Sequence, residues 1–504
     1  MAGGFHPGPD PRRFVVGSAA AAALSLAAAA AAAATRGSLP FLLVLGLLGL
    51  ASFAYLVWHV DPAWTLSGSI ALSVFGGYWG QLGPFGYLPV TPDRLMLVAG
   101  AGALLLRAPG ARHREPLRVE PVHWLLAGVI AFAVVSAFVS GTLLSKSEFF
   151  RLFDRFGVAP FLMFTLAPLA FPTKKHRKIF LGVLVALGGY LGLTALFETV
   201  GPHSLVFPRY ITNPELGFHV GRARGPFLEA EANGIALFLC GTAAAVAATT
   251  WRSSALVKGF CWLVVCLCFA GCLFSLSRGV WLGTAVAIFL TLLFFRPVRG
   301  LLVPALAGIP LVVVLLISLV PGLAASIDDR GNDMNSVWDR ENLNAAALRT
   351  VEARPLLGVG WGRFTDVGPP YFWQAKDRPL TAVGVQSCDS LPTGATQTAD
   401  GSRPQCTVPV HNAYLSNAAE LGLIGVTLWI VAGIVAIGGA VVRPGPPWAL
   451  PWRIGLFAVA MMWGVVVFFT PLEGPFSAVV LWTWAGIVWA SGIPVSRASS
   501  GGLA

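Results

Sequence analysis

One histidine and two arginine sites are the residues of this chain best suited to chemistry. His411 closes a polar stretch, residues 321–410, where the sequence turns apolar again. Arg278 lies between two long apolar runs with almost no loop, and Arg222, with Arg224 as a close alternative, ends another polar segment. Guanidinium groups offset charge that develops on a departing phosphate, and a neutral imidazole takes a proton from a hydroxyl group. These side chains therefore suit transfer from a diphosphate leaving group.

Each arginine also has a simpler explanation. Arg278 can extend its head group to the membrane interface, although a buried arginine without a ligand is costly. Arg222 can pair with Glu229 or Glu231, and this pairing does not exclude contact with diphosphate oxygens, which suit the planar fork of arginine. We expect Arg278, Arg222 and His411 to be catalytic.

We expect four more residues to bind substrate, namely Arg224, Arg340, Asn233 and Glu420. Asn233 follows the arginine pair at the start of an apolar run. Arg340 belongs to segment 338–352, whose apolar spacing predicts a helix, either on the membrane rim or packed within the loop. Glu420 either orients His411 or a basic group, or caps the next helix.

The elements that position these residues must be membrane helices. The chain has 504 residues, of which 56% are hydrophobic and only 11% are charged, whereas soluble domains carry about 25% charged residues. Its apolar runs do not alternate as barrel strands would, so they are helices with internally satisfied backbones. The sequence predicts an all-α polytopic membrane protein with about 12–14 transmembrane helices and one large extracytoplasmic loop.

Up to fourteen apolar runs are long enough to be read as spans. They lie near residues 14–34, 39–59, 65–80, 92–107, 122–143, 157–172, 178–197, 231–250, 257–275, 279–296, 300–320, 421–442, 454–470 and 476–492. The first also resembles a signal peptide, with Arg12 and Arg13 before an alanine-rich run, but a retained helix gives a consistent parity. The third is short and glycine-rich, which is typical of a re-entrant segment.

Charge sets the predicted orientation. With a cytoplasmic N-terminus, most lysines and arginines fall in cytoplasmic loops and most acids in external loops, as the positive-inside rule requires. This bias explains the net charge of +11, so we expect a lipid bilayer and no nucleic acid as partner. We expect transmembrane helices over 1–320, the extracytoplasmic loop over 321–411, more transmembrane helices over 412–492 and a cytoplasmic tail over 493–504.

The cysteines are divided between two environments. Five lie in predicted helices, where small thiols pack like apolar groups. Cys388 and Cys406 lie in the external loop, where an oxidising compartment permits a structural disulfide between them. The sequence contains no cysteine and histidine spacing typical of a metal site.

Four segments resemble the O-antigen ligase and polymerase superfamily of bacterial polysaccharide assembly, in the family's order. They are Arg222-Ala-Arg-Gly225-Pro-Phe with Asn233 downstream, Ser277-Arg278-Gly279, the run from Arg354 to Phe364, and His411-Asn412-Ala413 with Glu420-x-Gly422-x-x-Gly425. The resemblance covers roughly residues 200–440. The chain departs from the family at 228–233, where many members have Pro-Asn, which leaves substrate contacts at that helix start open.

The resemblance implies a glycosyltransferase of the cytoplasmic (inner) membrane that acts on its outer face. The donor would be a glycan on undecaprenyl diphosphate, and the acceptor a glycan or glycolipid. Arg222 and Arg278 would hold the diphosphate and His411 would be the base, with inversion at the anomeric carbon and no metal or other cofactor. Ligases of this family complete lipopolysaccharide, whereas polymerases extend exopolysaccharides and other cell-envelope glycans, and the sequence does not separate the two. The alternative from another class is a transporter or flippase of lipid-linked glycans.

Overall fold

A computed structural model describes residues 53, 55, 57–76, 91–107, 119–217, 219–332, 335–367, 410–471 and 474–492. Every regular element in these ranges is helical, and the described chain contains no strand. Within the described ranges, 8 helices are long and apolar enough to cross a membrane, and two shorter apolar helices, Arg278–Phe294 and Pro475–Ser491, accompany them. The prediction of an all-α polytopic membrane protein is confirmed.

The predicted spans from residue 92 onward all coincide with helices. The helices of the first half are α3 (Pro62–Ser73), α6 (Pro92–Arg107), α7 (Pro121–Val139), α8 (Lys146–Phe150), η2 (Arg151–Phe156), α9 (Val158–Ala170), α10 (Lys174–Val200) and α11 (Ala230–Thr250). Those of the second half are α12 (Ala255–Phe274), α13 (Arg278–Phe294), α14 (Arg296–Arg299), α15 (Leu302–Leu319), α16 (Leu323–Asn332), α17 (Asn335–Ala353), α18 (Phe364–Val367), α19 (Ala413–Gly433), η8 (Ile434–Gly438), α20 (Gly439–Val442), α21 (Ala449–Val466) and α22 (Pro475–Ser491). Short 3-10 turns occupy His203–Leu205, Arg209–Thr212 and Gly225–Phe227.

The first predicted spans are the least covered. Span 14–34 and most of span 39–59 lie outside the described residues, so the choice between a retained helix and a signal peptide stays a prediction. The third span is represented by α3, whose 12 residues are shorter than the roughly 20 that cross a bilayer. This length agrees with the short, glycine-rich character noted in the sequence.

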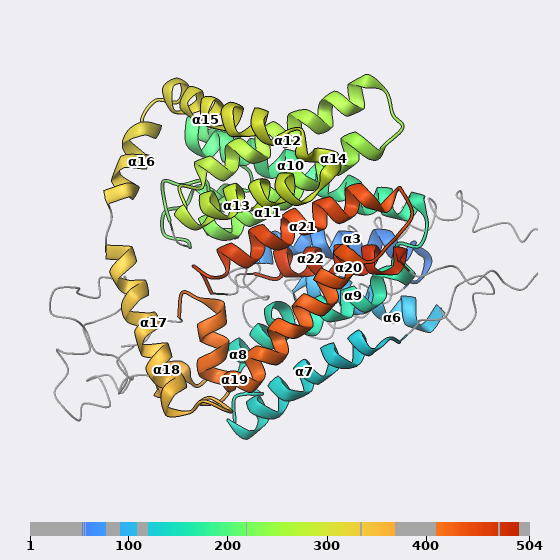
Figure 1. Ribbon diagram of the computed structural model, residues 1–504, viewed down its shortest axis with the longest axis vertical. Helices are drawn as coiled ribbons and strands as arrows, with labels where there is room; N and C mark the ends of the chain where they lie inside the picture. Colours follow the sequence, from blue (N-terminus) through green and yellow to red (C-terminus); the bar gives the residue numbers. More distant parts are fainter. Residues whose placement is uncertain are drawn as a thin grey trace, which may run out of the picture.

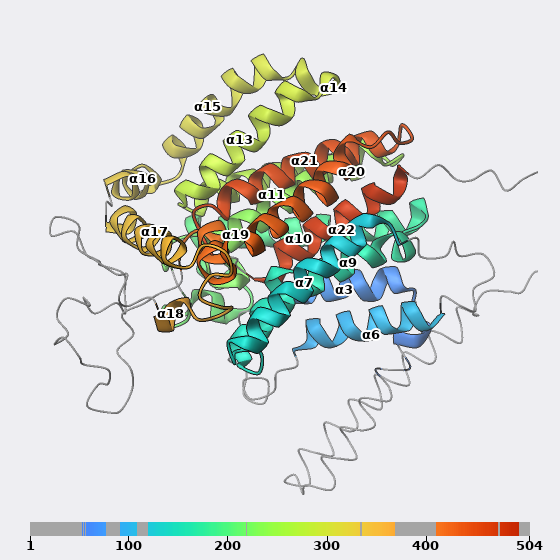
Figure 2. The same ribbon diagram turned by 60° about the horizontal axis from the view of Figure 1, so that its bottom comes forward.

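Helix α11 forms the centre of the bundle, between α10, α12 and α21. It is buried on almost all sides because its small alanines and glycines let neighbouring backbones approach. The same device occurs on α10, where a Cβ on Gly188 would lie only 2.9 Å from Val264. In contrast, no residue of α15 is buried, and Figures 1 and 2 show this helix at the outside of the bundle.

The described helices of the polar stretch 321–410, which we call the insertion, lie at one end of the bundle. Helices α16, α17 and α18 stand beyond the ends of the long helices at the left of Figure 1. Helix α17 covers segment 338–352, for which the sequence predicted a helix, and it packs against α19. Leu343, Ala346 and Ala347 are buried in a small core with Phe364 and Ala419. The apolar side of this helix therefore contacts protein. This agrees with the interpretation that the helix packs within the loop.

A glycine-rich segment ties this insertion to α19. The Val359 and Gly360 N–H groups donate to the carbonyls of Ala419 and Glu420, at 2.9 Å each. Gly422 has φ +70 inside α19, and a Cβ there would meet the Leu356 carbonyl oxygen at 2.1 Å. The glycines of two separate sequence segments are thus needed for one contact, because only residues without Cβ atoms allow this approach.

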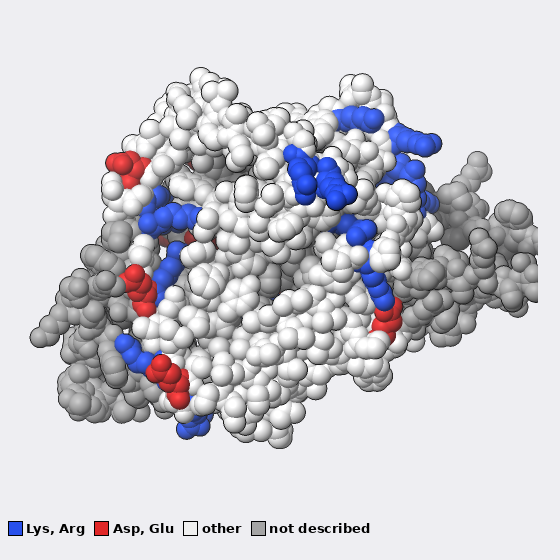
Figure 3. All heavy atoms as spheres, viewed as in Figure 1, with Lys and Arg blue, Asp and Glu red and all other residues white. Residues whose placement is uncertain are grey.

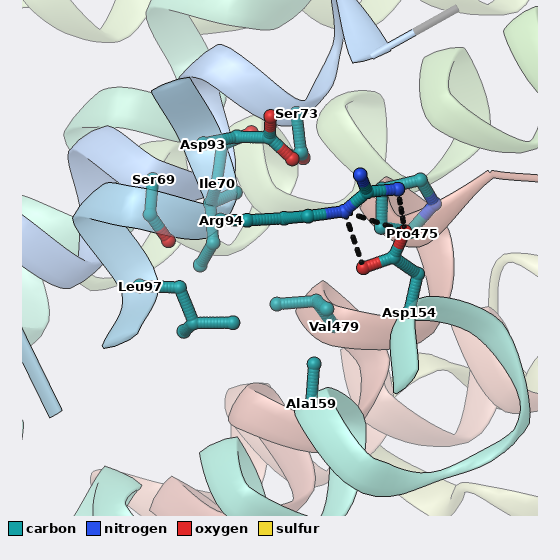
Figure 4. A pocket seen from close by; sticks show the side chains of 10 residues that line it. All are labelled: Ser69, Ile70, Ser73, Asp93, Arg94, Leu97, Asp154, Ala159, Pro475 and Val479. Carbon is teal, nitrogen blue, oxygen red and sulfur yellow. Dashed lines mark hydrogen bonds and ion pairs between the residues drawn. The ribbon is translucent and has the colours of Figure 1, made fainter. Parts of the chain in front are cut away.

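An ion pair inside the bundle joins α6 to η2 (Figure 4). The Arg94 Nε atom lies 3.0 Å from one Asp154 oxygen and 3.2 Å from the other, and Nη2 completes a bidentate pair. The Arg94 guanidinium also stacks on the Phe150 ring at 3.6 Å. The Asp154 side chain is 6% exposed, so its charge requires this partner.

Candidate active site

A pocket of about 310 Å³ brings together residues from four separate segments. Its lining residues are Arg278, Gly279, Leu282, Val337, Arg340, Glu341, Asn344, His411, Phe468 and Phe469. Three of them, Arg278, Arg340 and His411, are residues that the sequence singled out. The lining combines two arginines, a histidine and a glutamate with apolar side chains, and apolar walls with a few polar groups are typical of small-molecule sites.

A tight turn between α12 and α13 presents Arg278. Arg278 is the first residue of α13, and the preceding Ser275, Leu276 and Ser277 are buried. Leu276 has φ +48, a conformation that costs a non-glycine residue of the order of 1 kcal/mol and is concentrated at functional sites. The Trp281 indole donates to the Leu273 carbonyl at 3.1 Å across the turn. This packing explains how an arginine can stand between two membrane helices without a loop.

The start of α19 presents His411. Asn412 caps this helix, and its Oδ1 accepts from the N–H groups of Tyr414 and Leu415 at 3.0 and 3.1 Å. The Ala413 N–H donates to the Val467 carbonyl at 2.9 Å, which brings Phe468 and Phe469 to the pocket. Val410 is fully buried on the other side of His411. The histidine is therefore held between two anchored neighbours.

Helix α17 supplies the third wall. Arg340 and Asn344 are four residues apart and share one face of the helix, and Glu341 stands beside them in the pocket lining. The Asn344 Oδ1 atom is buried and accepts no hydrogen bond. Sequence reasoning did not identify Glu341 or Asn344; the only available signal was their spacing from Arg340.

Arg222 lies next to the turn that carries Arg278, in the neighbourhood of Glu231 of α11. The Ala223 N–H donates to the Phe274 carbonyl at 3.0 Å, so the Arg222 turn and the end of α12 are neighbours. The charge of Arg222 acts on Glu231, which also contacts Ser277 at 3.3 Å and His219 at 3.0 Å. This action of the Arg222 charge on Glu231 is in line with the alternative that the sequence offered for this arginine.

Arg224 has a different environment from Arg222. Its side chain is buried, and it donates to the carbonyl groups of Ile211, Asn213 and Leu216 at 2.6–3.2 Å. Asn233 supports the same turn, because its Nδ2 donates to the Ala223 carbonyl at 2.9 Å. The side chains of Arg224 and Asn233 thus both bind backbone carbonyls. The structure therefore distinguishes Arg224 from Arg222, which the sequence could not do.

Glu420 also lies apart from the pocket lining. Its carboxylate pairs with Arg151 and accepts from the Gly362 N–H at 3.1 Å. The Arg151 guanidinium stacks on the buried Trp361 ring at 4.1 Å. Of the alternatives open in the sequence, these contacts match the orientation of a basic group, and that group is Arg151.

The remaining predicted site residues are Cys388 and Cys406. Both lie outside the described residues, so their disulfide stays a prediction. Within the described ranges, no three histidine, cysteine or acidic side chains are grouped as metal ligands would be.

Two comparisons place the chain among known proteins. Residues 263–430 match the model of a family described as O-Antigen ligase. This range includes the Arg278, Arg354–Phe364 and His411 segments but begins after Arg222. A segment of 119 residues is 28% identical to the probable potassium transport system protein Kup of Acinetobacter baylyi and covers 19% of this chain. The chain spans 19% of the length of that curated relative.

Proposed function

We propose that this chain, which carries an O-antigen ligase family domain over residues 263–430, transfers a glycan from undecaprenyl diphosphate to an acceptor hydroxyl. The acceptor is a glycan or glycolipid, so the chain acts as an O-antigen ligase or a polysaccharide polymerase. The reaction takes place on the extracytoplasmic side of the cytoplasmic membrane.

The observation that carries this proposal is the single pocket shared by Arg278, Arg340 and His411. These residues come from α13, α17 and the start of α19, which are far apart in the chain. A cationic pair beside an imidazole matches the charges of the reaction, because negative charge grows on the leaving diphosphate while a proton leaves the acceptor.

The proposed step balances without a further reactant. The acceptor oxygen forms a bond to the anomeric carbon, and the bond from that carbon to the diphosphate oxygen breaks. His411 accepts the hydroxyl proton, and Arg278 and Arg340 bind the diphosphate that leaves with the lipid. Attack opposite the leaving group inverts the anomeric configuration. Apolar Leu282 and Phe468 in the lining suit the lipid end of the donor.

The other residues predicted from the sequence also contribute to the proposed site. Arg222 provides a third cationic group next to the Arg278 turn, and we propose that it also binds the donor diphosphate. Arg224 and Asn233 shape the turn that carries Arg222, and Glu420 anchors the glycine-rich segment, since their contacts are to backbone and to Arg151. We propose that these three residues position the site without touching the reacting atoms.

Surface charge supports the proposed orientation. On the face shown in Figure 3, blue side chains predominate toward the right-hand end of the helices, and most red side chains lie at the left, near the insertion. Basic residues collect on the cytoplasmic side of membrane proteins. This distribution supports our proposal that the insertion and the pocket beside it face the extracytoplasmic side.

Proteoliposomes distinguish glycan transfer from transport, the alternative function. Purified protein is supplied with an undecaprenyl-diphosphate oligosaccharide and a glycan acceptor, and both new glycosidic bonds and movement of the donor across the bilayer are measured. We expect new bonds that depend on the acceptor. Donor movement without a new bond, with every acceptor tried, would establish a transporter instead.

A further inference from the structure

Glu231 is a buried carboxylate that occupies the junction of the two arginine-bearing turns. It stands in the first turn of α11, and its side chain is 5% exposed. Neither the pocket lining nor the proposed reaction uses it. A carboxylate removed from water must be compensated by partners, so those partners indicate what it does.

The first partner group belongs to the Arg278 turn. Ser277 occupies the N-cap position of α13, yet its hydroxyl does not cap its own helix. Instead it donates to Glu231 Oε1 at 3.3 Å. Because Ser277 immediately precedes Arg278, this hydrogen bond fixes the backbone from which Arg278 extends.

The second partner group belongs to the Arg222 turn. His219 Nδ1 lies 3.0 Å from Glu231 Oε2, and Arg222 is close enough for its charge to act on the same carboxylate. His219 holds φ +62, a conformation that a non-glycine residue adopts only when its surroundings require it. One carboxylate therefore contacts both turns through opposite oxygens.

We propose that Glu231 is a positioning residue for the donor diphosphate, holding the Arg222 and Arg278 turns so that both guanidinium groups reach one ligand. The negative charge of Glu231 favours a guanidinium nearby, and the five N–H donors of Arg222 in their fixed fork can then be offered to phosphate oxygens. This inference rests on the proposed function. It adds that recognition of the lipid diphosphate, and not of the acceptor, depends on Glu231.

Two variants test the charge of Glu231 and its hydrogen bond with Ser277 separately. Glu231→Gln keeps the shape and an acceptor oxygen for Ser277 but removes the charge. Ser277→Ala keeps the charge but removes the hydrogen bond. Glu215→Gln is the matched control, because Glu215 is an exposed acid in the same loop region. For each purified protein in nanodiscs, we would measure affinity for undecaprenyl diphosphate without sugar, the donor and acceptor KM values, and the thermal unfolding midpoint.

We expect undecaprenyl diphosphate to bind about tenfold more weakly to Glu231→Gln, since the contacts of Ser277 and His219 are then no longer made to a charged group. Ser277→Ala should weaken binding roughly threefold to tenfold for the loss of an ordinary hydrogen bond. Donor KM should rise in parallel, while acceptor KM and the Glu215→Gln control stay within about twofold of wild type.

The competing explanation is that Glu231 only stabilises the fold. It predicts a lower unfolding midpoint with unchanged donor affinity in the folded protein, and that result would overturn the inference. Equal or tighter binding by Glu231→Gln would also overturn it, because the carboxylate would then compete with the ligand for Arg222. Where Glu231→Gln does not fold, Ser277→Ala decides by the same criterion. Wild-type protein that binds no undecaprenyl diphosphate would contradict the proposed function itself.

Discussion

Among single residues, the proposed reaction depends most on where the backbone places Arg278 and His411. Arg278 starts α13, where unpaired N–H groups add to the positive potential of its guanidinium. His411 immediately precedes the cap of α19. Both side chains are therefore attached to the starts of helices.

Replacement of Arg278 tests the diphosphate contact. Arg278→Lys keeps the charge but loses the planar fork, so we expect the donor KM of Arg278→Lys to rise about tenfold, and that of Arg278→Ala to rise further. Steady-state kinetics with purified protein measures this. Arg209→Ala, at an exposed arginine outside the pocket lining, is the control and should leave the donor KM unchanged. Wild-type kinetics in Arg278→Ala would exclude Arg278 from the donor site.

Sequence reasoning reached part of the candidate site and missed the rest for physical reasons. Arg278 and His411 were identifiable because charged and titratable groups at membrane edges are costly without a role. Glu341 and Asn344 were not, because polar residues are common in a surface helix and only the packing of α17 brings them to the pocket.

At the scale of elements, apolar runs predicted the helices well, and contacts between distant helices were not predictable. Hydropathy identifies a span because each residue contributes locally to transfer free energy. The pair of Arg94 and Asp154 joins residues 60 positions apart, and no local pattern indicates that they meet. The contact of Gly422 with Leu356 was unpredictable for the same reason. The glycine is recognisable in the sequence, but the segment that it contacts is not.

Loss of the Arg94 and Asp154 pair should destabilise the bundle. Asp154→Asn leaves the Arg94 guanidinium without a counter-ion at a mostly buried site, so we expect a loss of about 3 kcal/mol in unfolding free energy. Unfolding of purified protein in detergent measures it. Asp366→Asn is the matched control, because Asp366 pairs with Arg363 in the open, with both side chains more than 40% exposed, and should cost at most about 1 kcal/mol. Equal losses in the two variants would show that the buried pair is not a structural link.

At the scale of the whole molecule, the polar insertion and the pocket share one end of the bundle. Helices α16 to α18 stand at this end, and α17 is the part of the insertion that enters the pocket lining. Length and composition predicted that the insertion exists. Its attachment to α19 follows from side-chain packing around Leu343 and Ala347, which composition does not reveal.

The orientation of the chain can be tested with single cysteines placed in a variant lacking the native thiols. Lys175 and Asp366 are exposed residues at the start of α10 and within α18. Because α10 begins in a basic loop, we expect Lys175→Cys to be labelled by a membrane-impermeant maleimide only after the membrane is permeabilised. Asp366→Cys should be labelled in intact cells. Labelling with the reverse pattern would place the pocket on the cytoplasmic side.

The most direct test of the central claim is the transfer rate of His411→Ala. Glycan transfer from an undecaprenyl-diphosphate oligosaccharide is followed with purified wild type, His411→Ala and the control His203→Ala. His203 is exposed and lies in a short turn outside the pocket lining. Loss of a general base should lower kcat by about 10²–10⁴-fold, with donor affinity retained and the control unchanged. A His411→Ala rate within about threefold of wild type would contradict the assignment of His411 as the base.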